Sequence, residues 1–109
     1  MIVRYLRRTR DFGTCTIVAP SSNMNLELYV DADFAGLYRR DPDHSSSSAR
    51  SRTGYIIFFG GIPLVWRSFL QSDIALSTLE SEYTSLSHSI RTLIPVRSLV
   101  LELAKAGIY

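Results

Sequence analysis

The stretch ELYVDADFAG, residues 27–36, decides how the first part of this chain folds. From Leu26 to Asp33, apolar and polar side chains alternate, which is the period of a β-strand with one buried face. The apolar set is Leu26, Leu28, Val30 and Ala32, and the polar set is Glu27, Tyr29, Asp31 and Asp33. Both aspartates are therefore expected on one face, about 7 Å apart along the strand. Carboxylates are costly to desolvate, which raises the question of what these two bind.

Two apolar runs follow in GYIIFFGGIPLVWRS, residues 54–68. Because they flank Gly60-Gly61, they predict a hairpin of two strands. Pro63 falls at the start of the second strand, where a missing N–H matters least. Trp66 could lie in the core or serve as a stacking platform, and the core is expected. Residues 36–53 show no periodicity, so we expect a long, mobile surface loop in which the serine run is a spacer.

A helical period begins near Leu76. Ser77 and Glu80 have the spacing of a capping box, and Pro95 either interrupts the helix or begins a second one. Gly107 is expected to end the helical region. We expect one apolar stripe to pack on the sheet, made of Leu76, Leu79, Tyr83, Leu86, Ile90 and Leu93.

The N-terminal residues predict smaller elements. Residues 2–9 read as a short amphipathic helix that carries several Arg side chains, residues 14–19 as a short strand, and residues 19–23 as a turn.

Composition places the chain among small globular domains. It has 109 residues, 46% of them hydrophobic and 20% charged. Cys15 is the single cysteine, which excludes an internal disulfide and favours a reducing compartment. No apolar run approaches the ~18 residues of a membrane span. A net charge of +2 is not that of a dedicated nucleic-acid binder, yet eleven of the twelve basic residues are Arg. Their clusters could contact phosphate or form solvated faces.

Glu82 is the third carboxylate of interest. Glu80 has a local role in the capping box, whereas Glu82 lies beside the expected apolar stripe and has none. Glu82 could meet the strand aspartates or simply be solvated. Clustered hard oxygens suit Mg²⁺. A calcium loop is excluded, because Ala35 and Pro42 occupy the fifth and twelfth positions of that pattern. Both histidines, His44 and His88, are expected to face solvent.

Three segments in this order carry a specific resemblance. YVDADFAG (29–36), SRTGYIIFFGGIPLVWRS (51–68) and QSDIALSTLESEYTSLS (71–87) resemble the ribonuclease H domain of copia-type retrotransposon Pol polyproteins. RYLRRTRDFG (4–13) resembles the end of the reverse transcriptase connection segment. Residues 90–103 resemble the helix that follows the glutamate-containing motif in this family. The resemblance implies that residues 1–20 end the connection segment and that residues 21–109 form a partial ribonuclease H-like domain.

The resemblance also implies a fold and an activity. The fold would be α/β, a ribonuclease H-like mixed sheet that starts with three antiparallel strands followed by helices. The family hydrolyses the RNA strand of RNA–DNA hybrids with carboxylates and two Mg²⁺ ions. By motif, Asp31 and Glu82 would be catalytic and bind metal, with Asp33 as a further ligand, and Arg52 and Ser77 would contact the nucleic acid. The implied partners are the hybrid and the rest of the Pol polyprotein, in cytoplasmic virus-like particles and without a membrane.

The chain also departs from the family pattern. Phe34 replaces a frequent Trp, and the loop over residues 37–53 is longer than usual. The family takes a third metal-binding Asp from a strand after the helices, but no Asp follows Asp73. We therefore expect later strands to be missing, Mg²⁺ to bind weakly and the isolated chain to show little or no hydrolysis. The alternatives are a non-catalytic remnant that binds nucleic acid or a partner, and a relic without function.

Overall fold

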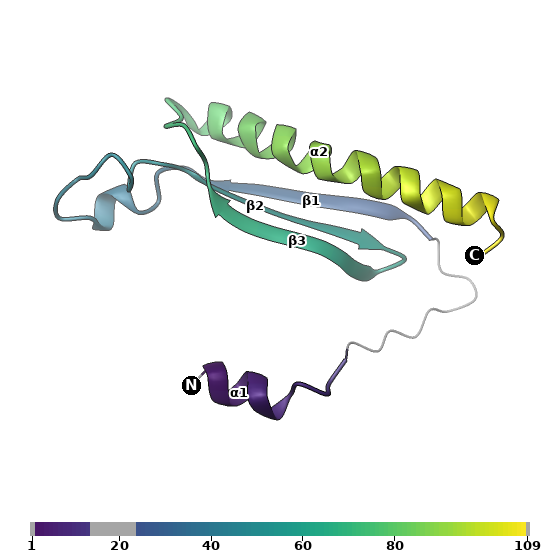
Figure 1. The fold of residues 1–109 in the computed structure, drawn as a ribbon. Helices are drawn as coiled ribbons and strands as arrows, with labels where there is room; N and C mark the ends of the chain where they lie inside the picture. The colour runs from purple at the N-terminus through teal and green to yellow at the C-terminus, as the bar shows by residue number, and fades with distance from the viewer. Residues whose placement is uncertain (1, 14–23, 109) are drawn as a thin grey trace.

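The computed structural model describes residues 2–13 and 24–108 and has a three-stranded sheet with one long helix on it (Figure 1). The predicted α/β class with an antiparallel three-strand start is confirmed. The strand and turn expected over residues 14–23 lie outside the described residues. The elements are α1 (Ile2–Arg8), β1 (Leu26–Asp33), the 3₁₀ helix η1 (Tyr38–Arg40), β2 (Arg52–Phe59), β3 (Ile62–Leu70) and α2 (Thr78–Lys105).

The sheet has the order β1-β2-β3, and both neighbouring pairs are antiparallel. The predicted hairpin is confirmed, since Gly60 and Gly61 join β2 to β3 with φ of 56° and 80°. Such positive values cost little only for glycine. Pro63 is the second residue of β3, close to its predicted place. This turn fixes the register of the two strands that follow one another directly in the chain.

The alternation in β1 is confirmed residue by residue, because half-buried and exposed side chains alternate along the whole strand. The register pairs Leu28 with Ile57 and Val30 with Tyr55. Side chains of directly paired residues share a face. The apolar side of β1 therefore lies beneath α2, and its acidic side lies on the opposite face of the sheet.

Buried polar groups lie in the contact between α2 and the sheet. Ser81, Ser85 and Ser89 are all 0% exposed. The Gln71 side-chain amide donates to Thr53 Oγ1 at 3.1 Å, to the Ser81 carbonyl oxygen at 2.9 Å and to Ser85 Oγ at 3.2 Å. The Thr53 and Ser85 hydroxyls are themselves 2.8 Å apart. Each of these buried polar groups therefore has a hydrogen-bond partner, as burial requires.

The expectation that the apolar stripe of the helix packs on the sheet is wrong. Leu79 and Tyr83 are 62% and 66% exposed, and Leu86 and Ile90 are exposed as well. The serine face packs instead, because small side chains let the helix backbone approach the strands and their hydroxyls satisfy buried polar groups. The stripe is thereby rotated away from the sheet.

Pro95 neither interrupts α2 nor begins a new helix. It lies inside one continuous helix of 28 residues. Its exposed position explains this, because the carbonyl that loses its helical donor can be solvated there. The expected ends are confirmed: Ser77 Oγ accepts from the Glu80 N–H at 3.1 Å, and Gly107 follows the helix with φ of 69°.

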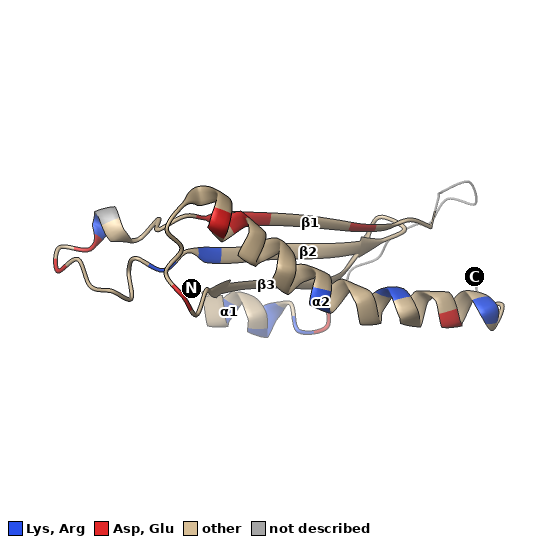
Figure 2. Ribbon diagram, turned by 90° about the horizontal axis from the view of Figure 1, so that it is seen from above, with Lys and Arg blue, Asp and Glu red and all other residues tan. Residues whose placement is uncertain are grey.

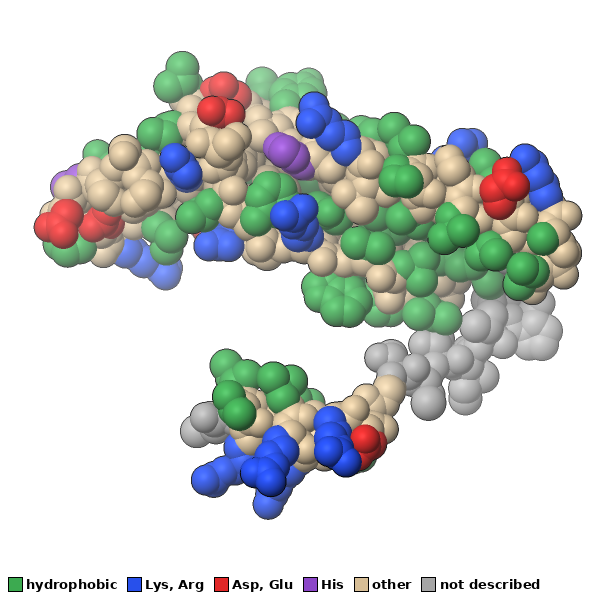
Figure 3. Space-filling model, in the orientation of Figure 1, with side chains coloured by type: hydrophobic (Ala, Val, Ile, Leu, Met, Phe, Trp, Pro, Cys, Tyr) green, Lys and Arg blue, Asp and Glu red, His purple; other side chains and the backbone are tan. Residues whose placement is uncertain are grey.

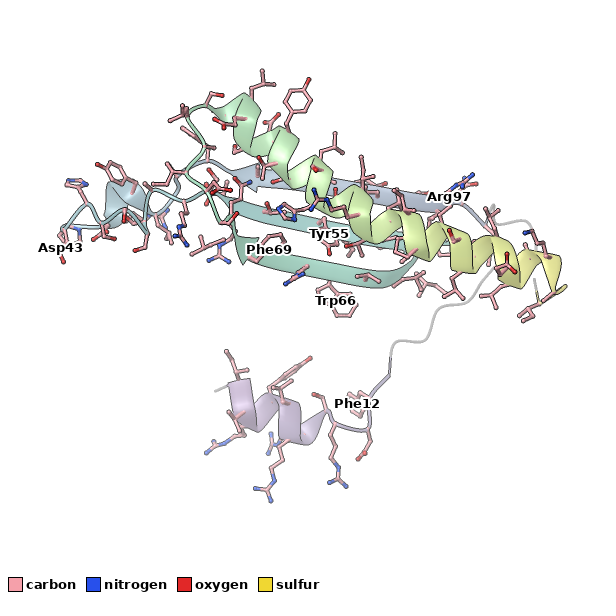
Figure 4. All side chains as sticks on the ribbon, turned by 45° about the horizontal axis from the view of Figure 1, so that its top comes forward. Phe12, Asp43, Tyr55, Trp66, Phe69 and Arg97 are labelled. Atoms are coloured by element: carbon pink, nitrogen blue, oxygen red, sulfur yellow. The ribbon has the colours of Figure 1, made fainter. Side chains whose placement is uncertain are left out.

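Trp66 is not in the core as expected. It is 69% exposed and lies on the face of β3 turned away from α2 (Figure 4). Tyr29 and Phe58 share this face and meet edge to face, with ring centroids 5.8 Å apart. Among the described elements, α2 is the one helix that contacts the sheet, so no described element covers this aromatic face.

The loop over residues 36–53 is more ordered than the expected spacer. The Asp41 carboxylate accepts hydrogen bonds from the Asp43 N–H at 3.0 Å and the Ser45 N–H at 2.9 Å. Ser48 in the serine run is buried. Hydrogen bonds from Ser48 and Ser45 hold the pKa of Asp41 well below its usual range. The serine run therefore shapes the loop around one carboxylate.

Helix α1 makes no contact with another described helix or strand. Its hydrophobic side chains lie on one side and its Arg side chains on the other (Figure 3), which confirms the predicted amphipathic helix. The chain exposes 8704 Å², compared with about 6,100 Å² for a compact protein of its mass. Many large hydrophobic side chains of the described residues are exposed, on α1, on α2 and on the far face of the sheet. Within the described residues, no helix combines the length and the apolar character needed to cross a bilayer.

Candidate functional site

One pocket of about 450 Å³ lies between the C-terminal half of β1 and the first turns of α2. It contains Asp31 and Glu82, two of the carboxylates that the sequence singled out. Figure 2 shows the acidic residues near the end of β1 beside those at the start of α2. The lining residues are Val30, Asp31, Ala32, Leu79, Glu82, Tyr83, Ser85 and Leu86.

The positions of the two carboxylates follow from the packing of their elements. Asp31 lies near the end of β1, which is an edge strand in the described sheet, so the pocket can open beside it. Glu82 follows the buried Ser81 on α2, and about 100° of helix rotation per residue puts it between the serine face and the apolar stripe. Both side chains are exposed and therefore stay hydrated. They can bind a cation without the large cost of burying a bare carboxylate.

Asp33 is not part of the pocket lining. Its carboxylate lies against the α-carbon of Gly36, so closely that a β-carbon added there would overlap it. Arg52 is the register partner of Asp33 on β2. Ser77 caps α2 through the Glu80 N–H. Asp31 and Glu82 therefore line the same pocket, whereas Asp33, Arg52 and Ser77 lie outside its lining.

A complete metal centre is not formed by the part of the chain that the structure describes. Across residues 2–13 and 24–108, no three His, Cys, Asp or Glu side chains gather where they could hold one ion. His44 is exposed as expected and lies against Tyr38. The expectation that His88 faces solvent is wrong, because it is half-buried and its ring meets Phe69 edge to face, with ring centroids 5.4 Å apart. The site therefore offers two hard oxygen donors with open space beside them.

Sequence reasoning missed how the helix contributes to this pocket. The sequence predicts a helix stripe that packs on the sheet, yet three of its residues form the apolar wall of the site: Leu79, Tyr83 and Leu86. The sequence does contain a signal for the true orientation, because serines recur at every fourth position in residues 81–89. A small-residue stripe with helical spacing marks close packing of a helix backbone.

The pair formed by Tyr29 and Glu27 was also missed. The Tyr29 hydroxyl donates to the Glu27 carboxylate at 3.1 Å. This hydrogen bond, with the negative charge of Glu27, raises the pKa of Tyr29 above its usual value. Strand alternation puts both Tyr29 and Glu27 on the face of β1 that carries Asp31.

Comparisons with known proteins find relatives among Pol polyproteins. The chain is 38% identical over 102 residues to the retrovirus-related Pol polyprotein from transposon TNT 1-94 of Nicotiana tabacum, covering 94% of this chain and 7% of that protein. It is 33% identical over 102 residues to the Pol polyprotein from transposon RE2 of Arabidopsis thaliana, with 94% and 6% covered. The secreted RxLR effector protein 161 of Plasmopara viticola is 35% identical over 88 residues, with 81% and 55% covered.

These comparisons identify the homologues of the chain as retrovirus-related Pol polyproteins from plant transposons. The chain spans only 6 to 7% of the length of these polyproteins. No protein-family description matches the chain, and no solved structure does. The similarity thus supports the Pol-derived part of the resemblance drawn from the sequence.

Proposed function

We propose that this chain, homologous to a segment of plant transposon Pol polyproteins, is the first part of a ribonuclease H domain that cleaves RNA in RNA–DNA hybrids. Residues 1–20 would end the reverse transcriptase connection segment, and residues 21–109 would begin the nuclease domain. One observation carries the proposal: Asp31 and Glu82, far apart in sequence, line one pocket. These are the two residues to which the sequence motifs assign catalysis.

The donor set suits Mg²⁺. Both side chains are carboxylates, the ligand type that this ion prefers, and both are accessible to water. Bound Mg²⁺ would supply an activated water and charge stabilisation for phosphodiester hydrolysis. Asp31 and Glu82, which line the same pocket, would hold the ion, and Asp33, which lies outside the pocket lining, would be a further ligand. Since two donors bind the ion weakly, the 109-residue chain is expected to hydrolyse hybrid slowly or not at all.

The first test is a titration of the 109-residue chain with Mg²⁺, in which NMR chemical shifts report binding. Weak, saturable shifts are expected at Asp31 and Glu82, and Asp31→Asn or Glu82→Gln should abolish them. Glu102→Gln is the matched control, because Glu102 is an exposed α2 carboxylate paired with Lys105 at 3.1 Å, near the other end of the helix. Shifts centred on another acidic segment, such as the Asp41 loop, would disprove the assignment of the site.

Activity is tested with a labelled RNA–DNA hybrid. The chain is expected to cleave it slowly or not at all, and any cleavage should disappear in Asp31→Asn and persist in Glu102→Gln. Robust cleavage by the 109-residue chain would contradict the expected incomplete metal centre. Cleavage that survives Asp31→Asn would refute the catalytic role of Asp31.

A second candidate function, binding of nucleic acid without catalysis, is favoured by the exposed basic side of α1. Arg4, Arg7 and Arg8 could hold phosphate groups without any metal. This alternative predicts that hybrid binding weakens steeply with salt, needs no Mg²⁺ and survives Asp31→Asn. Replacing the three arginines with Gln should remove such binding, and no binding at low salt would exclude this function.

A further inference from the structure

We propose that Gln71 is a positioning residue for the Asp31–Glu82 pair, because it ties the two carboxylate-bearing elements together from inside the fold. The inference deepens the proposed function and rests on it, since both carboxylates are taken to hold one ion. Gln71 follows β3 directly, is buried and does not line the pocket. It would therefore act through its neighbours.

The side chain of Gln71 holds α2 on both sides of Glu82. Its amide donates to the Ser81 carbonyl oxygen at 2.9 Å and to Ser85 Oγ at 3.2 Å. Ser81 precedes Glu82 and Ser85 lies three positions after it, so both contacts fall within one helical turn of the carboxylate. Ser85 itself lines the pocket. Gln71 thereby holds the helix at the place where its rotation decides the position of Glu82.

The same amide reaches the strand side of the pocket. It donates to Thr53 Oγ1 at 3.1 Å, and Thr53 is the register partner of Ala32, the residue next to Asp31. The Thr53 and Ser85 hydroxyls are in turn 2.8 Å apart. One buried amide therefore joins the strand position beside Asp31 to the helix turn that carries the second carboxylate.

The backbone of Gln71 adds a third connection, to the turn that follows β1. The Gln71 N–H donates to the Ser51 carbonyl oxygen at 2.8 Å, and the buried Ser51 Oγ accepts from the Ala35 N–H at 3.3 Å. Ala35 has φ of 48°, a conformation that is unfavourable for a residue with a β-carbon. The hydrogen bond from Ser51 therefore supports a turn that begins two residues after Asp33.

A small rotation of α2 would spoil the spacing of the two carboxylates. Side chains reach about 5–6 Å from a helix axis, so a rotation of about 20° moves a carboxylate by about 2 Å. Distances between a metal ion and its ligands have to be met within about 0.2 Å. Near Glu82 the side chains that pack on the sheet are serines, which are too small to interlock with the strands. Directional hydrogen bonds to Gln71 and Thr53 are therefore what can define the rotation.

The first measurement is the spacing of positions 31 and 82 in the absence of metal. Asp31→Cys and Glu82→Cys are combined with Cys15→Ser in the full 109-residue chain, and nitroxide labels on the two introduced thiols give a distance distribution by EPR. Adding Gln71→Leu should shift the mean or increase the width of this distribution by about 2 Å, the displacement expected for a modest rotation of α2. Circular dichroism at 222 nm verifies that each variant is folded.

Tyr55→Phe is the matched control. It removes a hydroxyl that lies 2.9 Å from Thr92 Oγ1, so it also breaks a hydrogen bond between α2 and β2, but further along the helix from Glu82. The distance distribution should stay unchanged in this variant. An equal change in Tyr55→Phe and Gln71→Leu would overturn the proposal, because it would mean that any loosening of α2 has the same effect.

The second measurement is the affinity for Mg²⁺ of the chain with its carboxylates intact, from NMR chemical shifts. Gln71→Leu should weaken binding about tenfold, as loss of a group that orients metal ligands does, and Tyr55→Phe should leave it unchanged. Failure of the unaltered chain to bind Mg²⁺ would refute the proposed metal site alone, because the EPR distances still decide whether Gln71 sets the spacing.

Ser85→Ala covers the case in which Gln71→Leu does not fold. It removes one acceptor of the Gln71 amide and the partner of the Thr53 hydroxyl, and it should change the distance distribution in the same direction. An unchanged distribution in the folded Gln71→Leu chain, or in Ser85→Ala where that chain does not fold, would overturn the positioning role of Gln71.

Discussion

Replacing Gln71 with leucine tests whether the polar contact between α2 and the sheet stabilises the fold. Gln71 is 2% exposed, and its side-chain amide makes three hydrogen bonds to Thr53, Ser81 and Ser85. Leucine has a similar volume and no polar atoms. Gln71→Leu therefore removes these bonds with little change in packing.

The size of the effect follows from the number of bonds. The Gln71 amide has two N–H groups for its three acceptors, so at about 1 kcal/mol for each neutral hydrogen bond the loss is about 2 kcal/mol. Burial of the leucine side chain returns about 1 kcal/mol. The hydroxyls of Thr53 and Ser85 keep each other as partners at 2.8 Å, so they add no further cost. We expect the free energy of unfolding to fall by about 1 kcal/mol and Tm to fall by about 5 °C.

The assay is urea unfolding followed by circular dichroism at 222 nm. Ser72→Ala is the matched control, because Ser72 is the exposed neighbour and its hydroxyl donates to the Asp73 carboxylate at 2.9 Å, away from α2. A double-mutant cycle with Ser85→Ala should give a coupling of about 1 kcal/mol between positions 71 and 85. A loss below about 0.5 kcal/mol with no coupling would refute the view that this polar network stabilises the packing of α2.

Three further outcomes are expected. The hydrogen bonds that the Asp41 carboxylate accepts in the loop should be complete above the unfolded carboxyl pKa of about 4. Because the native pKa of Asp41 is lowered, they should be lost only as pH falls well below that value. NMR titration of the Ser45 amide reports this, and loss of the bonds near pH 4 would contradict it. Tyr29 should ionise above its ordinary pKa of 10.0, and Glu27→Gln should lower its pKa again in a tyrosine NMR titration, since the hydrogen bond and the negative charge are both weakened. Pro95→Ala should stabilise the distal half of α2 by up to about 3 kcal/mol, measured as slower hydrogen exchange over residues 96–103; unchanged exchange would show that the missing hydrogen bond at Pro95 costs nothing.

Local patterns predicted the strands and their turn well. The alternation of β1 and the Gly60-Gly61 turn each depend on neighbours in sequence, so the residues themselves determine the outcome. The cap at Ser77 is equally local. These features need no knowledge of what packs against them.

The orientation of α2 could not be predicted in the same way. A hydrophobic stripe normally faces a sheet, yet here the serine face does, because buried Gln71 and Thr53 require hydroxyl partners. That requirement depends on a residue that follows β3, some ten positions before the serines. The prediction that Trp66 lies in the core was wrong for a related reason. Burial of Trp66 would require an element that covers the far face of the sheet.

The sequence predicts Asp31, Asp33 and Glu82 as metal ligands, and their roles stay predictions; their positions could be foreseen only in part. Asp31 and Glu82 line one pocket because strand alternation and helix phase bring them there. Asp33 is two residues further along the same face, yet the turn at Gly36 holds its carboxylate elsewhere. A turn of this kind is a backbone property that side-chain spacing does not reveal.

The serine-rich contact of α2 also has a calorimetric consequence. The heat-capacity increase on unfolding rises with newly exposed apolar area and falls with newly exposed polar area. Here the fully buried side chains are mostly hydroxyl-bearing, with Ile57 as the large apolar exception among them. The increment should therefore lie below the usual ~12–15 cal/mol/K per residue. A smaller increment flattens the curve of stability against temperature, so the fold would lose little stability on cooling.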